Sequence, residues 1–233
     1  MKAVFKREFK AYFSNPLGFI ILAIYYFFLG SYFSLIFSYG AANIGDVLLA
    51  MTMVIVFTMP VITMRLLSED RRQKVDQVLF TAPVKLSSIV FGKFFAALCL
   101  YALCFAPTVI YEIILMSYVS FNIIPYLYAM LGVLLLGGVL ISIGMFISSL
   151  TESIAVSAVL TLIVNIVALY ISSLATIVDS DILTKIAEKL AFVDVFQNFG
   201  KQVFSVPDIV YFLSIIAIFL FLSVRSLEKR RWS

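Results

Sequence analysis

Long apolar runs are the feature that most constrains how this chain can fold. Six segments are mostly apolar over roughly 20 residues or more, the length that crosses a hydrocarbon core about 30 Å thick. They lie at residues 16–38, 46–65, 94–119, 124–149, 153–178 and 207–227. We predict that each run is a membrane-spanning helix, because a helix satisfies its own backbone hydrogen bonds in lipid. The predicted fold is all-α integral membrane, with residues 1–233 as a single transmembrane domain.

Composition supports this class of protein. The chain is 63% hydrophobic and 13% charged, whereas soluble domains are about 45–50% apolar and about 25% charged. It contains no histidine, the commonest metal ligand and general base, so a metal site is not expected. Cys99 and Cys104 lie in one apolar run without sharing a helix face, and we interpret them as small buried hydrophobes. The acids within the spans are isolated, so we predict no catalytic residue and no intramembrane enzyme.

Lysine and arginine residues predict the orientation of the spans. They are concentrated in the N-terminal segment, in residues 65–93 and after residue 224, three regions that share one side by parity. Only Lys185, Lys189 and Lys201 fall in a loop on the opposite side. Both termini are therefore predicted to be cytoplasmic, in a bacterial cytoplasmic membrane. The net charge of +4 is interpreted as topology and attraction to anionic headgroups, and not as nucleic-acid binding.

The N-terminal segment predicts an amphipathic helix in the cytoplasmic interface. Phe5, Phe9, Tyr12 and Phe13 recur at helical spacing, and Lys2, Lys6 and Lys10 fall on another face. Two interpretations are compatible with this pattern. The helix is either a positively charged anchor or an elbow that transmits force to the first span.

A densely charged strip, SEDRRQKVDQVLFTAPVKLSS at residues 68–88, separates the second and third spans. Ser68 is a predicted N-cap, and Glu69 and Asp70 occupy the first turn, where the helix dipole favours acids. Pro83 ends the helix, because proline disfavours helical geometry in the preceding residue. A solvated loop is one interpretation. The cap, the acids and the proline stop favour a rigid helix that docks onto a cytoplasmic partner.

The stretch MRLLSEDRRQKVDQVLFTAPVKLSSIVFGKF resembles the signature of ABC-2-type transporter permeases. The matching positions are Ser68, Glu69, Asp70, Leu79, Thr81, Pro83, Gly92, Lys93 and Phe94. The segments KREFKAYFSNPLGF and LSVRSLEKRRW are similar to a gliding-motility-associated branch of that family. Many members have Gly-Thr where this chain has Lys74-Val75, and Glu where it has Gln77.

The resemblance implies a permease subunit that pairs with a second permease, identical or homologous, and with two cytoplasmic ATPase subunits. It implies that the helix between spans two and three is a coupling helix and that movement is mostly outward, as in an exporter. It assigns ATPase coupling to Ser68, Glu69, Asp70, Arg71, Arg72, Asp76, Thr81 and Pro83. An accessory subunit is left open, and so is the cargo.

The chain itself lacks a phosphate-binding loop. The Gly-Lys pair at Gly92-Lys93 has Ser87 where such a loop has its first glycine, and we interpret Lys93 as a turn and interface lysine. ATP and Mg²⁺ are therefore expected on the partner ATPase, and this chain is expected to bind no cofactor. The alternative function is an ATPase-independent membrane channel or scaffold protein.

Polar residues recur within the second and fifth spans. Ser157, Thr161 and Asn165 follow one another at steps of four residues. Thr52 and Thr63 lie close to three turns apart in span two, with Pro60 between them. A hydrogen-bonded helix seam explains these stripes. A pathway lining also explains them, and the resemblance implies that spans two and five line the pathway.

Two features mark the outer side. Glu112 lies roughly 27 Å up the third span, near the outer interface, where it either reaches the lipid headgroups or pairs with a neighbouring helix, or forms an outer gate. The loop at residues 179–206 is predicted to contain a helix. That helix either lies on the outer membrane surface or forms a lid or re-entrant hairpin over the exit.

Overall fold

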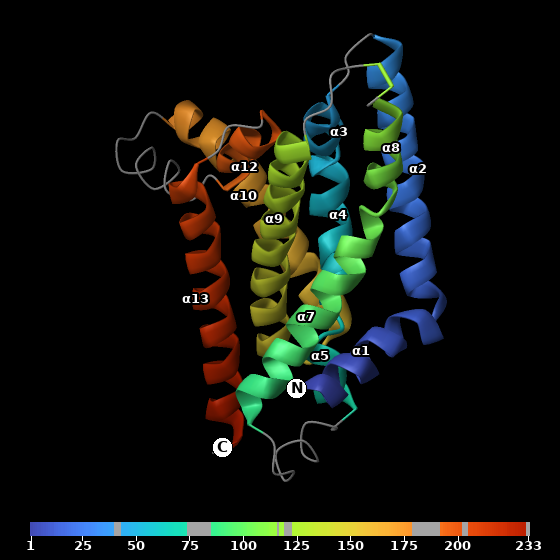
Figure 1. Ribbon diagram of the computed structural model, residues 1–233. Helices are drawn as coiled ribbons and strands as arrows, with labels where there is room; N and C mark the ends of the chain where they lie inside the picture. The colour runs from blue at the N-terminus through green and yellow to red at the C-terminus, as the bar shows by residue number, and fades with distance from the viewer. Residues whose placement is uncertain are drawn as a thin grey trace.

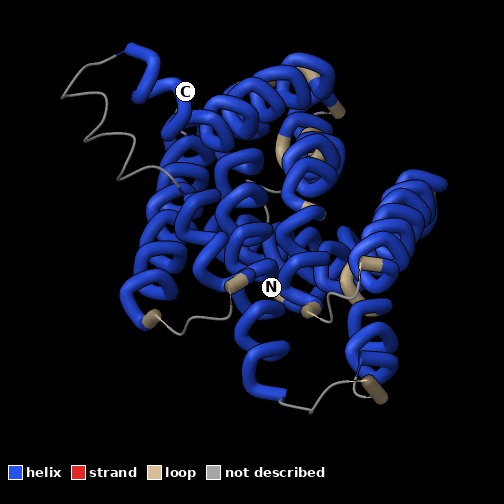
Figure 2. The backbone as a smooth tube through the Cα atoms, turned by 90° about the horizontal axis from the view of Figure 1, so that it is seen from above, coloured by secondary structure: helices blue, strands red, loops and turns tan. Residues whose placement is uncertain are grey.

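The computed structural model describes residues 1–39, 43–73, 85–115, 117–118, 123–178, 192–201 and 205–231. Within these ranges the regular structure is helical throughout, which confirms the predicted all-α fold (Figures 1 and 2). The helices are α1 Lys2–Ser14, α2 Pro16–Ser38, α3 Ile44–Ala50, α4 Thr52–Thr63, α5 Ser68–Arg72, α7 Leu86–Cys104, α8 Pro107–Leu115, α9 Ile123–Leu150, α10 Ile154–Val178, α12 Phe192–Gly200 and α13 Val206–Arg231.

Five stretches of helix are long and apolar enough to cross a membrane. They are Pro16–Ser38, Thr52–Arg72, Leu86–Leu115, Ile123–Leu150 and Val206–Arg230. Among the described residues, a shorter apolar stretch, Ile154–Ala168, forms the first part of α10. The chain is therefore a multi-pass membrane protein, and the six-span layout stays a prediction.

Two of the apolar runs are interrupted in the structure. The run at 46–65 is divided between α3 and α4 at Met51. The third run begins as helix earlier than residue 94, at Leu86, and α7 ends at Cys104 before α8 begins at Pro107. Proline lacks a backbone N–H and disfavours helical geometry in the residue before it, which accounts for the second break.

Helix α9 occupies the centre of the bundle. It contacts α4, α7, α10, α12 and α13, and its residues Val133, Leu136 and Leu140 are fully buried. Helices α2 and α13 lie at the periphery and expose large apolar side chains such as Phe27 and Phe221. The core thus forms around one helix, and the outer surface of the bundle is apolar, as a lipid environment requires.

The two ends of the bundle differ in character. Figure 1 shows α1, α5 and both chain termini at its lower end. At the upper end, α12 packs on α9 and α3, and it buries Phe196 and Phe199. Phe199 stacks on Tyr128 with the ring centroids 4.7 Å apart. The loop predicted to contain a helix therefore holds α12, whereas residues 179–191 lie outside the described residues, and a role as a surface helix or lid stays a prediction.

Candidate functional site

Three elements that are far apart in the sequence meet at the α1 end of the bundle. Helix α1 packs along α7, and the short helix α5 follows the end of α4. Figure 1 shows α1, α5 and the start of α7 close together at this end. The strip that sequence analysis singled out for coupling begins here.

Lys93 of α7 joins these three elements. Its Nζ lies 2.8 Å from Asp70 Oδ2 on α5 and 3.1 Å from Glu8 Oε1 on α1. The Lys93 side chain is only 1% exposed, so the interpretation of Lys93 as an interface lysine was wrong. Arg7 donates to Glu8 at 2.6 Å and lies 3.9 Å from Asp70. Two cations and two carboxylates thus balance one another, and we call this group the Lys93 cluster.

The electrostatics of Arg7 follow from the same neighbours. Burial lowers the pKa of Arg7, but the hydrogen bond and charge of Glu8, together with the charge of Asp70, outweigh burial and raise this pKa above its ordinary value. The guanidinium therefore stays charged and contributes to the balance of the Lys93 cluster.

Close packing brings α1 against α7 and places Glu8 beside Lys93. A Cβ atom at Gly92 would lie 3.1 Å from Val4 Cβ and 3.2 Å from the Met1 carbonyl oxygen, so glycine permits this approach. The Tyr12 hydroxyl donates to the Ile62 carbonyl at 3.0 Å, which also ties α1 to α4. The predicted amphipathic helix is thus fixed to two other helices.

The two acids of α5 have different partners. Glu69 accepts two hydrogen bonds from Arg65, at 2.8 and 2.9 Å, and a third from Gln73 at 3.2 Å. The paired geometry of a guanidinium and a carboxylate fixes the orientation of both side chains. Glu69 therefore joins α5 to the turn that precedes it, whereas Asp70 joins α5 to α7 and α1.

Ser148 of α9 organises the turn between α4 and α5. Its Oγ accepts from the backbone N–H groups of Leu67 and Ser68, at 3.0 and 2.9 Å, and donates to the Met64 carbonyl at 3.2 Å. Leu67 is the N-cap of α5, so the prediction of Ser68 as N-cap was wrong. Ser68 is buried, and its hydroxyl donates back to the Met64 carbonyl.

Arg71 connects α5 to the turn between α9 and α10. It donates to the Leu150 carbonyl at 3.0 Å and pairs with Glu152 at 2.9 Å. Arg72, the last residue of α5, is exposed. Helix α5 is therefore anchored on several sides and presents Arg72 on its free edge. The remaining residues predicted for coupling, Asp76, Thr81 and Pro83, lie outside the described residues.

The residues predicted to line a pathway fall in two groups. Ser157, Thr161 and Asn165 are at most 1% exposed and form one face of α10, the helix that packs on α4. Thr63 is also buried, at the α5 end of α4, and its hydroxyl donates to its own helix. Thr52 lies at the break between α3 and α4 and is half-buried. The structure thus brings four of the five into the α4–α9–α10 region.

A missing backbone donor in α4 explains the hydrogen bond of Asn165. Pro60 has no N–H, so the carbonyl of Val56, four residues earlier, loses its usual helical partner. The Asn165 side chain donates to that carbonyl at 3.4 Å. Among the described residues, no partner lies within hydrogen-bond distance of Ser157 Oγ, Thr161 Oγ1 or Asn165 Oδ1. The polar face of α10 is only partly satisfied by α4.

Glu112 lies on α8 and is half-buried. No ion pair joins it to another residue in the described part of the chain. Its neighbour Tyr111 stacks on Phe33 of α2 with the ring centroids 4.4 Å apart. In the described residues no three metal-ligating side chains gather into one group.

Sequence reasoning missed the roles of Glu8 and Ser148. Glu8 is the single acid in a basic N-terminal segment, and that isolated opposite charge was the available signal. Ser148 carries no such signal, because its partners are backbone groups about 80 residues away. Its function depends on where α9 passes α4.

Comparison with known proteins gives one result. A sequence model of the family described as ABC-2 type transporter matches residues 1–180. A search of the curated proteins finds no match. The matched region contains the Lys93 cluster, all of α5 and the polar face of α10.

Proposed function

The chain belongs to the ABC-2 type transporter family, and on that premise we propose that it is the permease subunit of an exporter powered by a separate cytoplasmic ATPase. The observation that carries the proposal is the anchoring of α5. Ion pairs and hydrogen bonds join this short helix to α1, α7, α9 and the turn that follows α4, while Arg72 stays exposed. A solvated loop needs no such attachment.

The proposed complex contains two copies of the ATPase, which bind ATP and Mg²⁺, and a second permease, identical or homologous. It lies in a bacterial cytoplasmic membrane with the α1 end in the cytoplasm. The excess of Lys and Arg at that end supports this orientation. An accessory subunit is compatible with the proposal.

The contacts of α5 suggest how a push from the ATPase reaches the membrane helices. Asp70 passes it to α7 and α1 through Lys93. Glu69 passes it to the end of α4 through Arg65, and Arg71 passes it to the turn before α10. Because α4 and α10 carry the buried polar residues, a displacement of α5 moves both walls of the proposed pathway.

The unpaired oxygens on α10 favour a pathway over a simple helix seam. A seam would pair them with α4, because an unsatisfied buried polar group costs about 1–3 kcal/mol. Ser157 and Thr161 are buried without such partners among the described residues. We propose that α4 and α10 separate during transport and that these groups then face water or cargo. Glu112 is proposed as an outer gate because it lies near the end of the bundle opposite to α1.

The test is a search for an ATPase gene beside the gene of this chain, followed by co-expression of the two, co-purification and measurement of ATP hydrolysis. Arg72→Glu should weaken ATPase recruitment and stimulated hydrolysis, because it reverses the exposed charge of α5. Lys201→Glu is the matched control, since Lys201 is an exposed basic residue beside α12 at the other end. Reversing Glu69 or Asp70 is a poorer test, because each also breaks an internal ion pair.

The outcomes separate the candidate functions. Loss of ATPase recruitment in Arg72→Glu, with normal recruitment in Lys201→Glu, would support docking of the ATPase at α5. Equal recruitment of the ATPase by the two variants would show that α5 is not part of the interface with the ATPase. A wild-type chain that never recruits an ATPase would favour the alternative, an ATPase-independent channel or scaffold.

A further inference from the structure

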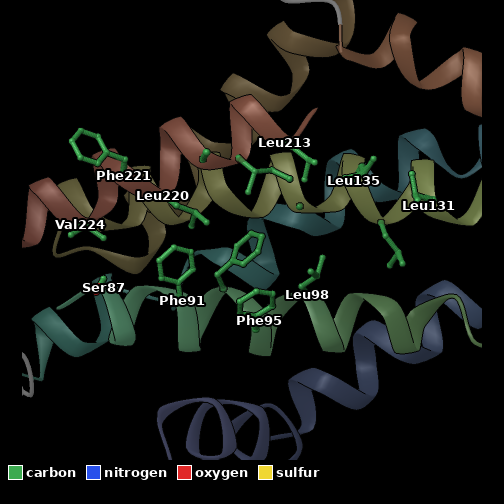
Figure 3. Close-up of a pocket in the computed structure, with 15 residues that line it drawn as sticks. Ser87, Phe91, Phe95, Leu98, Leu131, Leu135, Leu213, Leu220, Phe221 and Val224 are labelled. Carbon is green, nitrogen blue, oxygen red and sulfur yellow. The ribbon is translucent and has the colours of Figure 1, made fainter. Parts of the chain in front are cut away.

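An apolar groove runs along the outer face of the bundle between α7 and α13, with α9 as its floor. Its volume is about 580 Å³, and residues from all three helices line it (Figure 3). Phe91 and Phe95 form one wall and Leu220 and Val224 the other, as Figure 3 shows. Among the described residues that line it, Ser87 is the one with a polar side chain, and it lies at the α1 end.

The length of the groove matches one leaflet of a bilayer. Its lining extends from Ser87 to Leu98 on α7 and from Leu213 to Val224 on α13. Each stretch is about 16 Å long at 1.5 Å per residue. The hydrocarbon core is about 30 Å thick, so the groove spans about half of it. An acyl chain from the leaflet on the α1 side therefore has the right length to fill it.

Charge at the α1 end determines which lipid fits. Lys85, the exposed residue that caps α7, lies two residues before Ser87. Arg225 directly follows Val224, and its guanidinium lies 5.2 Å from the ring centroid of Phe221. Arg225 also pairs with Glu228 at 2.8 Å and keeps a side chain that is 64% exposed. These cations stand where the headgroup of a lipid in the groove would lie.

Selectivity must come from packing and charge, because bulk lipid is as apolar as the groove. The aromatic walls provide a fixed surface for van der Waals contact with an acyl chain. Lys85 and Arg225 attract a phosphate that carries net negative charge more strongly than a zwitterionic headgroup. Both features select for the same class of ligand.

We propose that the α7–α13 groove is a binding site for an anionic phospholipid of the leaflet on the α1 side. One acyl chain fills the groove, and the phosphate lies beside Lys85 and Arg225. The site also touches the coupling machinery, since Phe94 lines the groove and directly follows Lys93. A lipid bound in the groove therefore affects the position of α7 and, with it, the position of Lys93 in the Lys93 cluster.

Native mass spectrometry of the purified full chain tests the groove. The probes are phosphatidylglycerol and phosphatidylcholine with identical acyl chains. The wild type should retain phosphatidylglycerol in preference. Ala217→Trp places a large side chain in the groove and should lower retention several-fold. Ile218→Trp is the matched control, because Ile218 is exposed on α13 and does not line the groove.

A second pair of variants tests the headgroup. Lys85→Gln with Arg225→Gln should abolish the preference for phosphatidylglycerol and leave retention of phosphatidylcholine unchanged. Lys2→Gln with Lys6→Gln removes the same charge from exposed positions on α1 and should keep the preference. An unchanged preference in the Lys85/Arg225 pair would overturn the assignment of the headgroup.

Two further outcomes decide the proposal. If Ala217→Trp does not fold, Phe91→Ala with Phe95→Ala takes its place, since both side chains are partly exposed and should be removable without emptying the core. Retention equal to that of the wild type in the groove variants would overturn the proposal. Loss of association between copies, with lipid retention intact, would assign the groove to a protein contact.

Discussion

Lys93 shows how a single charge can be kept inside a membrane protein. Removing an ammonium group from water costs several kcal/mol unless carboxylates compensate it. Glu8 and Asp70 do so from two other helices, and their own side chains stay 15% and 17% exposed. Neither acid lies within a helical turn of Lys93 in the sequence, so local patterning could not pair them.

Lys93→Met tests the Lys93 cluster. We expect a loss of about 2 kcal/mol in stability, below the range for a fully buried pair because the two carboxylates keep some access to water. Thermal unfolding of the purified protein measures this loss, and ATPase stimulation should fall with it. Lys10→Met, on the exposed face of α1, is the control.

The reason for that loss can be checked separately. Adding Glu8→Gln and Asp70→Asn to Lys93→Met removes the unpaired carboxylates and should restore part of the stability. A melting temperature for Lys93→Met equal to that of the wild type would show that the cluster contributes nothing.

At the scale of the helices, α4 illustrates what sequence patterning can and cannot give. Pro60 indicates that one backbone hydrogen bond is missing, and the apolar run predicts a helix around it. The sequence does not reveal that Asn165, 109 residues from Val56, supplies the donor. Likewise Pro107 was a visible signal for the break before α8, whereas the break at Met51 carries no proline or glycine.

Asn165→Leu should destabilise the protein by about 1 kcal/mol, because it leaves the Val56 carbonyl buried without a donor. In a Pro60→Ala background the alanine supplies the backbone N–H, and Asn165→Leu should then cost little. A double-mutant cycle in chemical denaturation measures the coupling. Equal effects in the two backgrounds would contradict this account of the polar face.

The contact between α4 and α9 depends on Gly144. A Cβ atom there would overlap Thr63 Oγ1, and Thr63 is buried and β-branched, so it can move little. Gly144→Ala should therefore cost about 1–3 kcal/mol. Gly30→Ala on α2 is the control, because its Cβ would make an ordinary 3.4 Å contact with the Tyr111 hydroxyl. Comparison of their melting temperatures measures the difference.

The whole molecule has one charged end and one aromatic end. The Lys93 cluster, α5 and both termini lie at the first, and α12 closes the second with Phe196 and Phe199. From the basic residues of the sequence we predict that the first end lies in the cytoplasm.

Cysteine labelling in intact cells tests that orientation. In a background with Cys99→Ala and Cys104→Ala, a membrane-impermeant reagent should label Lys201→Cys and leave Lys10→Cys and Gln73→Cys unlabelled. All three positions are exposed. Permeabilised cells, in which every variant should react, supply the control. The reverse pattern would invert the proposed topology.

The sequence by itself determined the class of protein, the positions of most helices and the charged strip from which α5 starts. These follow from interactions between residues a few positions apart and from the solvent that an apolar run requires. The tertiary structure alone decided that Lys93 is buried, that Ser148 holds the α4–α5 turn and that α7, α9 and α13 enclose a groove. These features depend on how closely helices approach one another, which is set by side-chain packing across the bundle and not by neighbours along the chain.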